Sequence, residues 1–158
     1  MGTHKRTDEG LPSLREHRRT SKNIMEYVIG IVAATAVGLF GTVVGFDKER
    51  GFYPVVLIVI ATLYLLFAAM ANSAGSLVAE TIPALVFVTL AVLGFRKQAP
   101  WLVVAGLALH GVFDFFHHAV IVNPGVPAWW PGWCLSYDVV AAGYLAVLIR
   151  IRRSSSAA

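Results

Sequence analysis

Five apolar stretches, each about 20 residues long, divide this sequence and constrain its fold more than any other feature. That is the length an α-helix needs to cross the hydrocarbon core of a membrane. Several stretches of this length cannot all be buried in one soluble core. The sequence therefore predicts an all-α integral membrane bundle of five transmembrane helices, at about residues 25–46, 53–71, 76–95, 101–122 and 133–149.

The distribution of charge supports this prediction. Only 14% of the residues are charged and 57% are hydrophobic, whereas soluble domains have about a quarter charged residues. The charges gather near the two ends of the chain and in the short loops. We therefore divide the chain into a polar, mobile N-terminal tail (1–23), a transmembrane domain (24–151) and a C-terminal tail (152–158), and expect a multi-pass protein of the cell membrane surrounded by lipid.

The positive net charge does not indicate a nucleic-acid partner. The net charge is +4, but the Lys and Arg residues flank the predicted spans, where they fix topology and contact anionic lipid. We therefore expect no nucleic acid among its partners. Cys134 is the single cysteine, which excludes an intrachain disulfide and predicts that no metal site uses cysteine.

The basic residues also predict an orientation. Five spans place the two termini on opposite sides of the membrane. The loops at 47–51 and 96–100 and the C-terminal end share one side and hold seven Lys and Arg, whereas the loops at 72–75 and 123–132 hold none. We expect the C-terminus to be cytoplasmic. The six basic residues of the N-terminal tail oppose this, and a start at Met25 would remove the conflict.

Small residues form a ridge on the first span. Gly30, Ala34 and Gly38 follow one another at four-residue spacing, a pattern that lets helix backbones approach closely. The ridge predicts either tight packing within the chain or the seam of a homodimer.

The fourth span carries ionisable residues on one face. At 100° per residue, His110, Asp114 and His117 fall within about 60° of one another, and His118 widens the arc. Ionisable residues within spans are costly and are usually functional. Glu80 in the third span and Asp138 in the fifth lie toward the same side of the membrane. We therefore expect three or more of the group to converge on one point: Glu80, Asp114, His117, His118 and Asp138.

His and carboxylate ligands from facing helices are how bundles build zinc and di-iron sites. The leading interpretation is a metal-dependent membrane hydrolase for a lipid or other amphiphile, in which Glu80 is the general base for a water bound to Zn or Fe. The predicted ligands are His110, Asp114, His117, His118 and Asp138. Three alternatives stay open: a proton- or ion-coupled carrier using the same residues as a relay, polar contacts that only hold helices together, and a non-catalytic membrane subunit.

His and Asp residues at one end of a helical bundle resemble the layout of membrane metallohydrolases of the ceramidase and adiponectin-receptor type. The resemblance covers residue types in the third to fifth spans and implies a metal-dependent hydrolase. Those proteins have seven spans and this chain has five, so no residue role is carried over.

Overall fold

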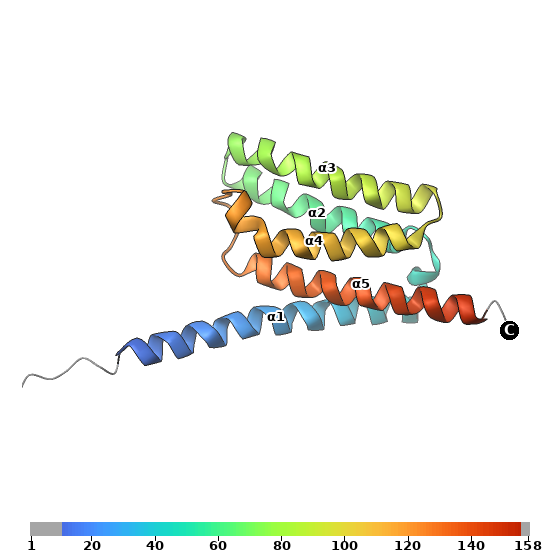
Figure 1. Cartoon of the computed structure of the whole chain (residues 1–158), viewed down its shortest axis with the longest axis horizontal. Coiled ribbons are helices and arrows are strands. Elements are labelled where there is room, and N and C mark those ends of the chain that lie inside the picture. Colours follow the sequence, from blue (N-terminus) through green and yellow to red (C-terminus); the bar gives the residue numbers. More distant parts are fainter. Residues whose placement is uncertain (1–10, 156–158) are drawn as a thin grey trace, which may run out of the picture.

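The computed structural model describes residues 11–155, with side chains described from Ile24 onward. The fold is all-α. The helices are α1 (Leu11–Val44), α2 (Phe52–Met70), α3 (Ala74–Arg96), α4 (Pro100–Val120) and α5 (Trp130–Ser155), with a short 3₁₀ helix η1 (Phe46–Lys48). Figure 1 shows the five helices running side by side, so that successive helices alternate in direction.

Each of the five helices is long and apolar enough to cross a membrane, which confirms the predicted fold class. In α1 the apolar segment is Ile24–Val44, and the helix itself begins earlier, at Leu11. The predicted mobile tail lies partly outside the described residues. Large apolar side chains cover the outer surface, including Val43 at 85% exposure and Val78 at 70%. Such a surface is stable against hydrocarbon and costly against water.

The helices pack in a fixed order. α5 lies between α1 and α4, α2 packs on α3, and α4 also contacts α2 and α3. The small-residue ridge of α1 faces α5: a Cβ atom at Gly30 would overlap Trp133 O and Ser136 Oγ, and one at Gly38 would lie 3.1 Å from the ring of Tyr144. The ridge is therefore used for packing within the chain. A homodimer through the same ridge would have to displace α5.

The loop between α4 and α5 closes one end of the bundle. Asn123 Nδ2 donates to Tyr64 O at 3.1 Å, and Ser76 Oγ donates to Val122 O at 2.9 Å. At Gly125 a Cβ atom would overlap the carbonyl of Phe67, so only glycine allows this close approach to α2. These contacts bring the loop against the ends of α2 and α3, beside the ionisable residues of the spans.

Candidate metal centre

One face of α4 supplies the core of the site. His110, Asp114 and His117 are at most 1% exposed, while Phe115 on the opposite side is 67% exposed. This confirms the predicted helix face. Asp114 faces the bundle interior and Phe115 faces outward because a carboxylate turned toward lipid would cost several kcal/mol, whereas a phenylalanine there costs nothing.

Two helices bring four possible metal ligands together. His110 and Asp114 come from α4, and Cys134 and Asp138 come from α5, at an i, i+4 spacing on each helix. One ligand atom from each of these residues lies within 4.8 Å of the others, and all four side chains are buried. We call this set the α4–α5 group.

His110 is the centre of the α4–α5 group. Its Nδ1 lies 2.6 Å from Asp138 Oδ2 and 3.3 Å from Asp114 Oδ2. Cys134 Sγ lies 4.0 Å from Asp138 Oδ2. Two buried carboxylates thus approach one imidazole nitrogen, and burial requires that their charge be balanced by a proton or a cation.

Several buried polar atoms of the group make no hydrogen bond to a described residue: His110 Nε2, Asp114 Oδ2 and Asp138 Oδ1. Of these, Asp114 Oδ2 lies 3.3 Å from His110 Nδ1. A buried polar atom without a partner costs about 1–3 kcal/mol. Unused lone pairs on a nitrogen and two carboxylates are what a cation would occupy.

Glu80 and His117 form a second contact, toward the α4–α5 loop. His117 Nε2 lies 2.8 Å from Glu80 Oε1, which also accepts from Asn123 Nδ2 at 2.9 Å. Glu80 is 1% exposed and His117 is fully buried. We call these two residues the Glu80–His117 pair.

Tyr64 of α2 connects the two sets. Its hydroxyl donates to Asp114 Oδ1 at 2.6 Å, and its ring stacks on His117 at a centroid distance of 4.1 Å. The phenol is 1% exposed. Four helices, α2 to α5, therefore contribute to one buried polar cluster.

No family model, characterised protein or solved structure matches this chain. The function is therefore argued from the site itself.

The sequence predicted one convergence point, and the structure brings together a different set around it. The α4–α5 group includes His110, Asp114 and Asp138 but not His117, which contacts Glu80 instead. His118 is exposed on the outer side of α4, and this placement gives no support to its predicted role as a ligand.

The sequence predicts that Cys134 takes no part in a metal site. In the structure, however, its thiol belongs to the α4–α5 group of possible metal ligands. One thiolate is enough when His and carboxylates supply the other ligands. The signal was present in the sequence, because Cys134 precedes Asp138 by one helical turn and so shares its face of α5. Tyr64 carried no comparable signal, since tyrosine in a span is ordinary.

Proposed function

We propose that this chain is an integral membrane metalloprotein that binds one divalent cation, with zinc as the first choice, through the α4–α5 group. The observation that carries the proposal is the convergence of four buried donor residues of mixed type, His110, Asp114, Cys134 and Asp138, within 4.8 Å.

The donor set fits zinc by its chemistry. Zn²⁺ accepts nitrogen, sulfur and oxygen ligands together and has no geometric preference of its own beyond four-coordination. One divalent cation also balances two carboxylates, which removes the cost of burying Asp114 and Asp138 as neighbours. The 2.6 Å contact between His110 and Asp138 would have to open to admit the ion. Iron stays the alternative metal, because imidazole and carboxylate ligands suit it as well.

The enzymatic form of the proposal is hydrolysis of a lipid or other amphiphile, in which Glu80 would act as the general base for a metal-bound water. Its support is the presence of imidazole and carboxylate donors in one buried cluster. Glu80 makes its contacts with His117 and Asn123, so it would have to rotate or act through a water to serve the α4–α5 group.

A specific observation favours a second candidate, a proton relay. The Glu80–His117 pair, Tyr64 and the α4–α5 group place titratable side chains one after another through the buried cluster. Chains of Asp, Glu and His inside spans are how carriers move protons.

Metal analysis of the purified protein tests the proposal. We expect about one zinc or iron ion per chain after mild detergent extraction, and a marked loss of that metal in Asp138→Asn. His118→Gln is the matched control, because it removes an imidazole from the same helix at an exposed position. It should keep the metal of the wild type.

Cobalt substitution gives a second readout for Cys134. A thiolate bound to Co²⁺ produces a near-ultraviolet charge-transfer band, which Cys134→Ser should abolish while cobalt stays bound with weaker affinity. A wild-type protein that takes up neither zinc nor cobalt would overturn the metal proposal. Proton movement by that metal-free protein in liposomes would then establish the relay.

A further inference from the structure

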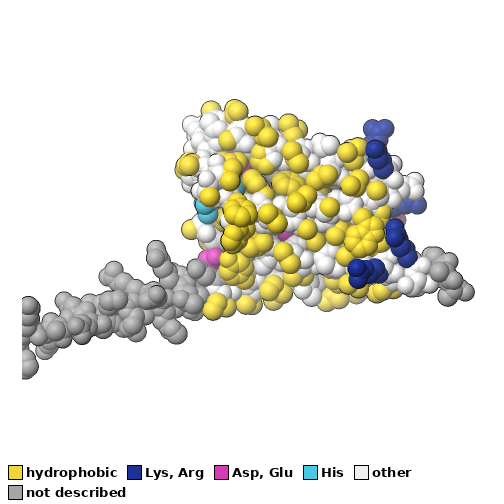
Figure 2. All heavy atoms as spheres, viewed as in Figure 1, with side chains coloured by type: hydrophobic (Ala, Val, Ile, Leu, Met, Phe, Trp, Pro, Cys, Tyr) yellow, Lys and Arg dark blue, Asp and Glu magenta, His cyan; other side chains and the backbone are white. Residues whose placement is uncertain are grey.

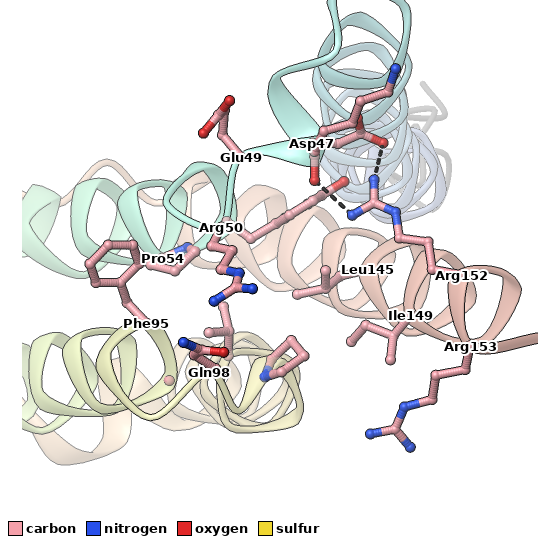
Figure 3. A pocket seen from close by; sticks show the side chains of 15 residues that line it. Asp47, Glu49, Arg50, Pro54, Phe95, Gln98, Leu145, Ile149, Arg152 and Arg153 are labelled. Atoms are coloured by element: carbon pink, nitrogen blue, oxygen red, sulfur yellow. Dashed lines mark hydrogen bonds and ion pairs between the residues drawn. The ribbon is translucent and has the colours of Figure 1, made fainter. Parts of the chain in front are cut away.

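A cavity of about 350 Å³ opens at the end of the bundle farthest from the α4–α5 loop. Its lining comes from η1 and the connection that follows it, the first turn of α2, the end of α3 with the turn into α4, the first turns of α4 and the C-terminal part of α5. Figure 3 shows that the side chains lining the cavity come from separate elements of the chain. The cavity shares no residue with the α4–α5 group or the Glu80–His117 pair.

The mouth of this cavity is positively charged. Lys48, Arg50, Arg152 and Arg153 line it, against Asp47 and Glu49. Figure 2 shows Lys and Arg gathered at this end of the molecule. Figure 3 shows Arg50 and Arg153 on different sides of the cavity, with the apolar side chains of Leu145 and Ile149 between them.

Arg152 has a structural role that fixes the wall of the cavity. Its Nη2 lies 2.9 Å from Asp47 Oδ2, and its Nη1 donates to Asp47 O at 2.8 Å. The Asp47 side chain is only 3% exposed. This bidentate contact balances one charge of each sign and ties η1 to α5. It leaves three lining cations without an ion pair to a described residue: Lys48, Arg50 and Arg153.

The interior of the cavity combines apolar surface with an unused hydrogen-bond donor. Pro54, Leu145 and Ile149 provide buried carbon surface. The hydroxyl of Tyr53 is buried in the lining and has no partner among the described residues. A ligand that satisfies all of these groups carries an anionic, hydrogen-bond-accepting head and an apolar part.

The depth of the cavity along the membrane-spanning helices indicates that this ligand is a membrane lipid. The cavity lies where α2 begins, where α3 ends and where the apolar part of α5 gives way to Arg152 and Arg153. These boundaries place it at the depth of lipid headgroups. Basic pockets between spans at this depth suit phosphate headgroups of anionic lipids.

We propose that this cavity binds an anionic phospholipid, with the phosphate at its basic mouth, which Arg50 and Arg153 line, and the start of the acyl chains against Leu145 and Ile149. The inference is independent of the metal proposal, since the two sites lie at different ends of the bundle.

Native mass spectrometry of the detergent-solubilised protein tests it, with dioleoyl phosphatidylglycerol, dioleoyl phosphatidylcholine and inorganic phosphate as separate probes. We expect the wild type to retain phosphatidylglycerol in preference to phosphatidylcholine and to bind inorganic phosphate much more weakly. The double variant Arg50→Gln, Arg153→Gln should bind phosphatidylglycerol about tenfold more weakly or worse. The variant Arg96→Gln, Lys97→Gln removes the same charge at the same end outside the cavity, and it should bind as the wild type does.

Three results would overturn the proposal. Equal losses in the two double variants would show that only net surface charge matters. Equal binding of phosphatidylglycerol and phosphatidylcholine would show that the basic side chains do not select an anionic headgroup. Displacement of phosphatidylglycerol by inorganic phosphate at similar concentration would identify a free-anion site.

Thermal unfolding of the wild type is a second test, and it needs no variant. Phosphatidylglycerol should raise the unfolding temperature above that measured in phosphatidylcholine, and equal temperatures would contradict the proposal.

Discussion

Tyr64 holds a carboxylate with its hydroxyl and an imidazole with its ring. The hydroxyl bonds Asp114 and the ring stacks on His117. Among the hydrogen bonds and ring contacts of the described residues, Tyr64 is the one residue of α2 that contacts both the α4–α5 group and the Glu80–His117 pair. Its two interactions are separable, because removal of the hydroxyl leaves the ring in place.

Tyr64→Phe should lower the free energy of unfolding by about 1–2 kcal/mol, because the buried Asp114 Oδ1 loses its hydrogen-bond donor. Unfolding by sodium dodecyl sulfate in mixed micelles measures this loss. Tyr137→Phe is the control, since the hydroxyl of Tyr137 makes no hydrogen bond to a described residue and its ring is also buried. Equal losses in the two variants would show that the Tyr64–Asp114 bond contributes nothing of its own.

At the scale of the elements, the interface between α1 and α5 depends on small residues. Gly30 lies directly against the backbone of α5 at Trp133, and Gly38 lies against the ring of Tyr144. Thr42 Oγ1 and Tyr144 Oη are 2.8 Å apart farther along the same seam. Close backbone approach maximises dispersion contacts, which hold helices together where lipid removes the hydrophobic driving force.

Gly30→Ala should destabilise the bundle by about 1–3 kcal/mol, because the new methyl group meets backbone atoms that cannot move aside. Gly143→Ala on α5 is the matched control: a Cβ atom there meets nothing within 4 Å, and alanine favours a helix over glycine. Thermal unfolding in detergent should therefore separate the two variants. A Gly30→Ala protein as stable as Gly143→Ala would mean that α1 does not pack on α5 in this way.

At the scale of the whole molecule, the two ends of the bundle differ in chemistry. One end carries the basic residues of the η1 segment, the α3–α4 turn and the end of α5. The other end lies beside the Glu80–His117 pair and the closing loop. This unequal distribution of basic residues predicts the orientation of the bundle in the membrane, since short loops rich in Lys and Arg stay in the cytoplasm.

We therefore predict that Lys97→Cys is protected and Ser73→Cys is labelled when intact cells meet a membrane-impermeant maleimide. Cys134 is fully buried, so the wild type should give little background and serves as the control. After the cells are opened, both variants should label. Labelling of Lys97→Cys alone in intact cells would establish the opposite orientation.

Properties that depend on local pattern could be predicted from the sequence alone. Span number follows from the lengths of the apolar stretches, and the buried face of α4 follows from the 100° step between His110, Asp114 and His117. The common end of the basic residues follows from an odd number of spans. The small-residue ridge predicted close packing, and only its partner, α5, was left to the structure.

Which ionisable residues contact one another depends on how the helices pack. Each helix can rotate about its axis and shift along it relative to its neighbour, and one residue of shift turns a side chain by 100°. That freedom is removed only by packing between helices, which a sequence pattern within one helix does not specify. Packing brought Cys134 and Asp138 to His110, paired His117 with Glu80, and left His118 on the outside.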